Sequence, residues 1–429
     1  MFQTIRNAWR IPDLRKKLLY TLGMLIIFRF GSYVPVPYLD RARVMALLSA
    51  GGGSSLLDFM NIFSGGAFAN ATIFAMSITP YINASIIMQL LTVAIPALER
   101  ISKEGEEGRK KLAQWSRYLT VVLALIQAIG LYFTLKNGYQ AVTTPGFLAG
   151  ATIVLTFTAG TAFLMWLGEQ INDKGIGNGI SILIFAGIVS RGPQMIQAIV
   201  EYNKSGTLNI FTTIILIVVA VIVIGFVVAM TNAERKIPVQ YSKRVVGRKM
   251  YGGQSTSIPI KVASAGVMPI IFAMSIMAFP GTVTSFFVND ISKVKGFWGV
   301  VLKVLSPSHW VYGILYFLLI LFFTYFYTAI QFNPIEMANN MKKSGGFIPG
   351  IRPGRNTSDY ISKVLSRITV VGAVFLGLIA VLPIFMSQTA SLNISIGGTS
   401  LLIVVGVALE TVKAMETQMV MRHYKGFLE

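Results

Sequence analysis

The chain has no cysteine among its 429 residues and only two histidines, His309 and His423. Without a thiol, neither a disulfide scaffold nor a thiolate metal site can form. Charged residues are also scarce, at 13% of the chain, whereas soluble domains carry about a quarter. Together with 54% hydrophobic residues and a mean hydropathy of +0.66, this composition predicts an integral membrane protein.

Acidic residues are the rarer charged class, with 17 Asp and Glu against 37 Lys and Arg, for a net charge of +20. Binding of nucleic acid, contact with anionic lipid, or membrane topology alone would each account for this excess. The basic N-terminal segment Met1–Lys17 lacks a small-residue cleavage site after its apolar run, which predicts an uncleaved cytosolic lead. Because basic loops stay on the cytosolic side, the alternation of loop charge predicts that both termini are cytosolic.

Apolar runs give about ten segments of about 20 residues, which is long enough to cross a bilayer. Five precede Tyr202 and five follow it, and an odd number of spans per half produces inverted repeats. The predicted fold is therefore an all-α polytopic membrane protein with two units, residues 1–200 and 201–429. The predicted spans lie near residues 18–35, 71–93, 115–135, 150–169, 178–199, 210–230, 261–287, 310–330, 366–387 and 398–418.

The second span, Ala71–Leu91, is a poor lipid-facing helix because Pro80 lies in its middle and removes a backbone hydrogen bond. Ile78, Ile82, Ser85 and Gln89 share one face at helical spacing. Two isoleucines followed by polar side chains predict the wall of an aqueous cavity that closes with an apolar constriction. The seventh span also contains prolines, and interrupted spans at matching places in two halves point to a central site.

Two basic loops are larger than topology requires. In residues 231–260, Val239–Tyr241 and Val245–Tyr251, joined around Ser242–Arg244, are expected to form a projecting hairpin. In residues 331–363, glycines and prolines enforce turns that display Arg352. Two readings remain open for these loops, namely solvated loops without a partner and a docking surface for a large cytosolic partner.

On the outer side, an amphipathic segment, Ser55–Phe63, lies between two glycine clusters, Gly51–Gly53 and Gly65–Gly66. Glycine clusters act as hinges or turns. One interpretation is an interfacial helix on the outer leaflet, and the other is a mobile stopper that folds back into the cavity. Its apolar face consists of Leu56, Leu57, Met60 and Phe63.

The spans contain almost no ionisable side chain that could serve transport or catalysis. Arg29, Glu169 and Glu410 lie near span ends, where snorkelling or an interhelical ion pair is expected. The G-x-S-x-G and H-E-x-x-H motifs are missing, so we expect neither an enzyme nor a cofactor. A secondary transporter with inverted repeats is the alternative, but it needs a charged site near the midplane. A scaffold or insertase without a pore is a third class.

Several long motifs resemble the SecY family, the channel subunits of the bacterial Sec protein translocon. They are FRFGSYVPVP (Phe28–Pro37), FSGGAFANATIFAMSITPYI (Phe63–Ile82), LMWLGEQINDKGIGNGISILI (Leu164–Ile184), QSTSIPIK (Gln254–Lys261) and IPGIRPG (Ile348–Gly354). The resemblance runs nearly end to end. It implies ten helices in two pseudosymmetric halves around an hourglass pore with a plug and a lateral gate.

The resemblance also implies the function and the partners. Such a channel passes unfolded secretory polypeptides across the bacterial plasma membrane and releases transmembrane segments laterally into lipid. A docked SecA ATPase or a ribosome drives it. The other implied partners are the SecE and SecG subunits, signal peptides, translocating polypeptides and anionic membrane lipids.

Family positions map onto this sequence residue by residue. In the second span the chain reads Ser77-Ile78-Thr79-Pro80, where many relatives have a Gly-Ile-Met-Pro type of stretch. The implied pore ring is Ile78, Ile82, Ile184, Ile188, Ile271 and Ile403, and the implied plug region 55–70 includes Ser55, Leu56, Leu57, Met60, Phe63, Gly65 and Gly66. The implied lateral-gate residues are Thr79, Gln89 and Ser275, and the implied docking residues are Lys243, Arg244, Arg248, Lys249 and Arg352.

Overall fold

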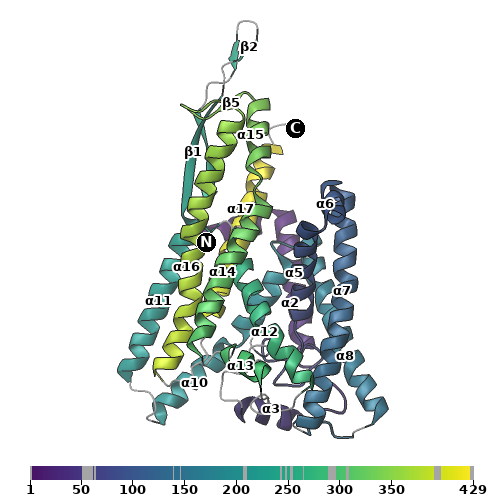
Figure 1. Cartoon of the computed structure of the whole chain (residues 1–429). Coiled ribbons are helices and arrows are strands. Elements are labelled where there is room, and N and C mark those ends of the chain that lie inside the picture. The colour runs from purple at the N-terminus through teal and green to yellow at the C-terminus, as the bar shows by residue number, and fades with distance from the viewer. Residues whose placement is uncertain are drawn as a thin grey trace.

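Long helices run side by side through the molecule, and a small group of strands projects from one end (Figure 1). Six helices are long and apolar enough to cross a membrane, within the residues described. A seventh crossing results if α5 (Thr79–Ala94) and α6 (Pro96–Lys103), which meet at a 101° bend, count as one. The computed structural model describes residues 2–50, 61, 64–138, 140–144, 146–205, 210–241, 244–246, 249–251, 255–263, 265–287, 296–305, 309–390 and 398–425.

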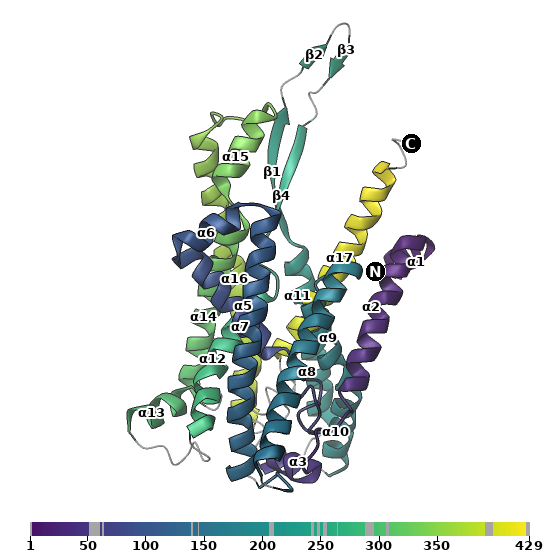
Figure 2. The same ribbon diagram turned by 90° about the vertical axis from the view of Figure 1, so that its right-hand side faces the viewer.

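In the first half of the chain, α7 packs between α5 and α8, and α2 and α9 also pack against α8. Both ends of the chain lie toward the strand-bearing end of the molecule (Figure 2). Besides α5 and α6, the helices here are α1 (Phe2–Arg10), α2 (Pro12–Gly31), α3 (Arg41–Ala50), α7 (Glu106–Phe133), α8 (Phe147–Lys174), α9 (Gly179–Ser190) and α10 (Gly192–Lys204), with a short π-helix at Thr134–Gly138.

In the second half, α14 packs against α12 and α16, and α17 packs against α11 and α16. The two halves meet where α12 contacts α5 and α7 and where α17 contacts α9. The helices here are α11 (Ile210–Asn232), α12 (Met268–Phe287), α13 (Phe297–Val304), α14 (Trp310–Gln331), α15 (Pro334–Lys343), α16 (Arg355–Ala390) and α17 (Gly398–Lys425).

Each predicted span overlaps these helices, but two boundaries were wrong. The second span is helical only from Thr79, so Pro80 lies in the first turn, where its missing N–H breaks no helical bond. The fifth is confirmed, since α9 and α10 together make one apolar helical span over Gly179–Glu201. The seventh begins at Met268, since strand β4 (Ser255–Lys261) and a turn precede it. The division into residues 1–200 and 201–429 stays a prediction, and residue 200 lies within α10.

The buried turns before α5 take the place of the predicted helix. Ala71 and Ser77 have positive φ values of 49° and 56°, and the Ile73 amide donates to the carbonyl of Val34 at 3.1 Å. The segment packs against α8 at Gly160, where an added Cβ would lie 2.0 Å from the carbonyl oxygen of Ile73. This close approach fixes the point at which α5 begins.

The strands form two small antiparallel sheets. β1 (Glu234–Tyr241) pairs with β4 on one edge and with β5 (Gly346–Phe347) on the other. β2 (Arg244–Val246) pairs with β3 (Lys249–Tyr251). The projecting hairpin therefore exists, but its predicted pairing was wrong, because Val239 faces Thr256 rather than the segment Val245–Tyr251.

The two large basic loops form one folded unit. Its apolar core joins β1 and β4 to α15 and the N-terminal end of α16, and it includes Ile237, Val239, Ile260, Met341, Ile348, Ile361 and Leu365. Pairing of β1 with β5 links residues 231–260 to residues 331–363 directly. This explains why both loops are longer than a simple connection between helices requires.

Candidate functional site

The six isoleucines of the predicted ring all belong to one large buried cluster. Ile78 and Ile82 lie at the start of α5, Ile184 and Ile188 on α9, Ile271 on α12 and Ile403 on α17. All six are between 0% and 8% exposed and belong to one cluster of buried hydrophobic residues. Helices from both halves of the chain therefore contribute to a cluster of branched apolar side chains, which is closed to solvent in this structure.

Local geometry stacks the isoleucines on their helices. The Ile82 amide donates to the Ile78 carbonyl at 3.1 Å, which closes the first turn of α5 and holds the pair at i,i+4 spacing. On α9, the Asn178 side chain caps the helix by accepting from the amides of Ile180 and Ser181. Branched hydrocarbon side chains offer no hydrogen bonds to water, so such a cluster blocks ions by dewetting.

The predicted gate residues lie on two helices that touch. Thr79 and Gln89 are on α5 and Ser275 is buried on α12, and the two helices pack together. The Thr79 hydroxyl is buried and neither donates nor accepts a hydrogen bond among the described residues. Gln89 donates to the Ser85 hydroxyl at 3.4 Å. The two predicted gate helices therefore pack together. Among the described residues, however, no hydrogen bond joins the three polar side chains to one another.

Most of the predicted plug, namely Ser55, Leu56, Leu57, Met60 and Phe63, lies outside the described residues. Gly65 and Gly66 are described, with φ values of 65° and 87° that favour glycine. A Cβ on Gly65 would lie 2.8 Å from the Cα of Gly187 on α9. The glycine end of the predicted plug region therefore lies directly against a helix that carries two of the ring isoleucines.

Arg29 ties this segment in place. Its guanidinium donates to the Gly65 carbonyl at 3.2 Å, to the Ser190 hydroxyl at 3.0 Å and to the Tyr33 hydroxyl at 2.9 Å. Three parts of the chain, α2, the glycine end of the predicted plug region and α9, are thus joined by the Arg29 side chain. From the sequence, Arg29 is expected only at a span end. A lone arginine in an apolar run must satisfy its five N–H groups, which is the signal that could have identified it.

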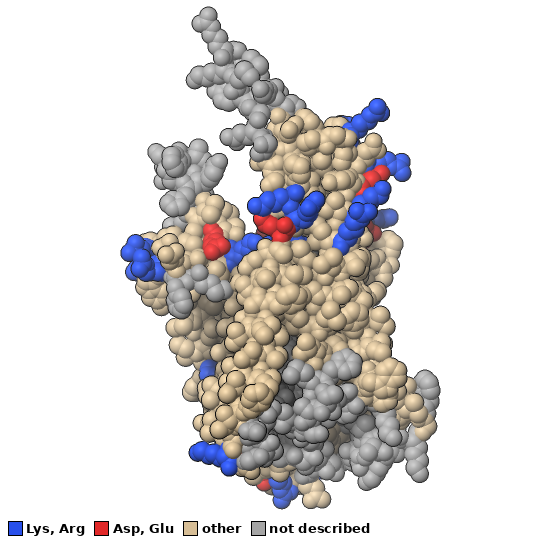
Figure 3. All heavy atoms as spheres, turned by 90° about the vertical axis from the view of Figure 1, so that its left-hand side faces the viewer, with Lys and Arg blue, Asp and Glu red and all other residues tan. Residues whose placement is uncertain are grey.

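The predicted docking residues lie on the strand-bearing end. Arg244 and Lys249 belong to β2 and β3, whereas Lys243 and Arg248 lie outside the described residues. Arg352 is exposed in the turn before α16, and its carbonyl accepts from the Thr357 hydroxyl at 3.0 Å. On the face drawn in Figure 3, most Lys and Arg side chains gather toward this end of the molecule.

Of the three ionisable residues at span ends, one forms the expected interhelical pair. Glu169 on α8 accepts from Arg117 on α7 at 2.7 Å. Glu410 on α17 forms no ion pair with a described residue.

Known proteins resemble the chain over most or all of its length. A family model described as SecY matches residues 72–412. The chain is 48% identical to a protein translocase subunit SecY of Halalkalibacterium halodurans and 47% identical to that of Bacillus subtilis, and in each case all of both chains is covered.

Two solved structures share the fold. One is described as a protein conducting channel, with a TM-score of 0.66 and 20% identity, and the match covers 95% of this chain and 93% of that one. The other is Sec61 in a canine ribosome-channel complex, with a TM-score of 0.65, 19% identity and the same coverage. At these identities the likeness concerns the fold alone.

Proposed function

The chain belongs to the SecY family, and on this basis we propose that it is a protein-conducting channel. It passes unfolded secretory polypeptides across the plasma membrane and releases transmembrane segments laterally into lipid. The observation that carries this function is the burial of six isoleucines from four helices in one cluster where the two halves meet. Family membership and this cluster favour a channel over the secondary transporter considered from the sequence.

The ring acts as a gasket. In the closed state its apolar side chains exclude water and so oppose the passage of ions. Because isoleucine makes no directional bonds, the same side chains can slide along any extended polypeptide. The channel is thus unselective toward side chains once it is open, and selection must occur at the opening step.

We propose that opening separates α5 and α7 from α12, which packs against both of them and carries α14 on its other contacts. A signal peptide carries an apolar helix of about 7–15 residues. Its transfer from water toward lipid yields about 25 cal/mol per Å² of buried apolar surface, which offsets the loss of contact between the gate helices. Thr79, Gln89 and Ser275 lower the cost of parting these helices, because polar groups gain water when the gate opens.

The plug closes the outer side of the ring in this proposal. Gly65 and Gly66 provide the hinge, since both adopt backbone angles that other residues disfavour. Arg29 holds the hinge against α9 while the channel is closed. Release of the three Arg29 bonds accompanies opening.

The energy for movement comes from a docked partner. We propose that SecA or a ribosome binds the folded unit made of residues 231–260 and 331–363, with Arg352 and the basic hairpin residues as contacts. We also propose SecE, SecG and anionic lipids as partners, and cytosolic positions for both termini in a bacterial plasma membrane. The gathering of basic side chains at the strand-bearing end supports this orientation.

Substitution Ile403→Asn tests the ring. An amide buried without partners in the cluster costs about 1–3 kcal/mol and brings water into the gasket. We expect vesicles with this variant to leak ions without substrate and to export precursors with defective signal sequences. Ion leak and signal stringency equal to those of the unaltered chain would contradict the proposed role of the cluster.

A further inference from the structure

A cavity of about 420 Å³ lies on the strand-bearing side of the isoleucine cluster. The ends of α11 and α14, the middle of α17, the turn before α12 and Asn178 at the start of α9 surround it. Three of its lining residues, Val267, Leu376 and Leu402, belong to the same buried cluster as the ring, and Leu402 directly precedes Ile403. The cavity therefore adjoins the constriction on the side from which, in the proposed function, a polypeptide arrives.

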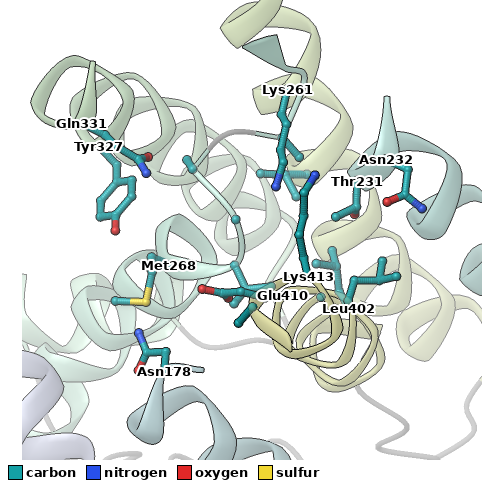
Figure 4. A pocket seen from close by; sticks show the side chains of 18 of the residues that line it. Asn178, Thr231, Asn232, Lys261, Met268, Tyr327, Gln331, Leu402, Glu410 and Lys413 are labelled. Atoms are coloured by element: carbon teal, nitrogen blue, oxygen red, sulfur yellow. The ribbon is translucent and has the colours of Figure 1, made fainter. Parts of the chain in front are cut away.

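The charges of the ionised side chains in this cavity do not sum to zero. Lys261 at the end of β4 and Lys413 on α17 point their ammonium groups toward each other (Figure 4). Glu410 points to another part of the cavity, and neither lysine forms an ion pair with a described residue. Two facing cations and one separate carboxylate leave one excess positive charge.

Two facing ammonium groups are costly unless an anion lies between or beside them. Burial, followed by the nearby Lys413, lowers the pKa of Lys261 to about 8, so Lys261 remains largely charged at neutral pH. The Asn178 amide nitrogen and the Tyr327 hydroxyl also point into the cavity (Figure 4). The two lysines form the basic part of the cavity wall, whereas Asn178 and Tyr327 lie on the side toward which Glu410 points (Figure 4).

We propose that Lys261 and Lys413 bind the carboxylate side chains of the polypeptide in transit, immediately before they reach the isoleucine ring. The inference rests on the proposed function, because a moving polypeptide is the occupant that this position next to the ring provides. A single carboxylate balances the one excess charge of the wall. Acidic residues are thus held briefly at the cavity, whereas neutral residues pass it freely.

Zero-length crosslinking with a carbodiimide tests the contact, because it joins an amine to a carboxylate only when the two touch. The complete translocon in vesicles receives a series of stalled precursors in which one Asp is moved residue by residue along a neutral stretch. We expect a crosslink to Lys261 or Lys413 in those precursors whose Asp stops just short of the ring. A matched series with Asn is expected to give none.

Three variants of the channel sharpen the result. K413R keeps the charge and removes the reactive amine, so the crosslink is expected to fall on Lys261 alone. The double variant K261Q/K413Q is expected to lose the crosslink and to export Asp-rich and Asn-rich precursors at the same rate. K174Q, which alters an exposed lysine at the end of α8 outside the cavity, is expected to behave as the unaltered chain.

Protease protection of the same precursors separates this inference from the proposed function. Precursors that reach the protected lumen yet crosslink to neither lysine at any position would overturn the inference and leave the channel function standing. A crosslink that persists in K261Q/K413Q would also overturn it. If no precursor became protected, the channel function would fail, and the inference with it.

Discussion

Lys261 is held in surroundings that disfavour its charge. Burial is the main cause of its lowered pKa, about 8 against an ordinary 10.5, and Lys413 adds to it, while Glu410 and Glu234 act in the opposite direction. Between about pH 8 and 10.5 the unfolded chain therefore binds the proton that the folded chain has lost. The contribution of Lys261 to the free energy of unfolding therefore rises with pH between about 8 and 10.5. Below about pH 8 the folded chain bears the full cost of the buried charge.

The pH dependence of amine acetylation at Lys261, followed by mass spectrometry, measures this directly. We expect half-maximal reactivity near pH 8. K413Q is expected to raise the pKa only part of the way to 10.5, since burial remains, and E410Q is expected to lower it further. An unchanged midpoint in both variants would show that the two neighbours on α17 do not act on Lys261.

Gly160 illustrates how one residue positions the ring. Because a Cβ there would lie 2.0 Å from the Ile73 carbonyl oxygen, Gly160→Ala must push the segment before α5 away from α8. Overpacking of this kind costs about 1–3 kcal/mol. We expect a loss of that size in the free energy of unfolding, measured in mixed micelles.

Gly23 on α2 is the matched control. An added Cβ there meets no atom within 4 Å, so Gly23→Ala is expected to leave stability unchanged or to raise it by up to about 1 kcal/mol through helix propensity. Equal losses in the two variants would mean that close contact with Ile73 is not what requires glycine at position 160.

At the scale of elements, one side chain joins the glycine end of the predicted plug region to both α2 and α9. Arg29 bonds to Gly65 and Ser190, so loss of the guanidinium frees the hinge without disturbing the ring. Hydrogen bonds to a charged group contribute about 1.5–3 kcal/mol each. We expect Arg29→Gln to favour opening by about 1–3 kcal/mol, or about 5- to 150-fold.

Single-channel conductance without substrate is the readout, with export of precursors that carry defective signals as the second. Arg29→Lys keeps the positive charge but loses the several N–H donors of the guanidinium, so an intermediate effect is expected. Arg41→Gln, at the start of α3, is the control at an exposed arginine. A closed-state conductance in Arg29→Gln equal to that of the control would mean that Arg29 does not hold the channel shut.

The sequence predicted the helices well because spanning segments are long and uniformly apolar, a property local to each segment. It failed at Pro80, where an apolar run continued through buried turns, since burial in turns and burial in a helix select the same residues. The hairpin register was also missed. Val239 pairs with Thr256 because β5 and the apolar core below it fix β1 in place, and such a constraint comes from a distant segment.

The candidate site shows the same limit. The isoleucine ring was reached through family resemblance, and its members then proved to share one buried cluster. Arg29 and the pair Lys261 and Lys413 were not identified, because their meaning depends on what faces them. A lysine at the end of a strand and another on the last helix look like ordinary basic residues until the fold places them together.

At the scale of the whole molecule, two halves meet along a small number of helix contacts. α12 touches α5 and α7 on one side, and α17 touches α9 on the other. The isoleucine cluster lies where these contacts converge, with the lysine cavity directly beside it. Two parts of the chain joined through a shared apolar cluster suit a channel that opens by moving one part against the other.

Crosslinking from Ile78→Cys tests this account most directly, because the natural chain has no cysteine of its own. A stalled secretory precursor carries a single cysteine at the position expected inside the ring. The account predicts a disulfide crosslink that forms only when the motor or ribosome is present. Active export with no crosslink at Ile78, nor from equivalent cysteines at Ile184 and Ile271, would mean that polypeptides do not pass through the isoleucine ring.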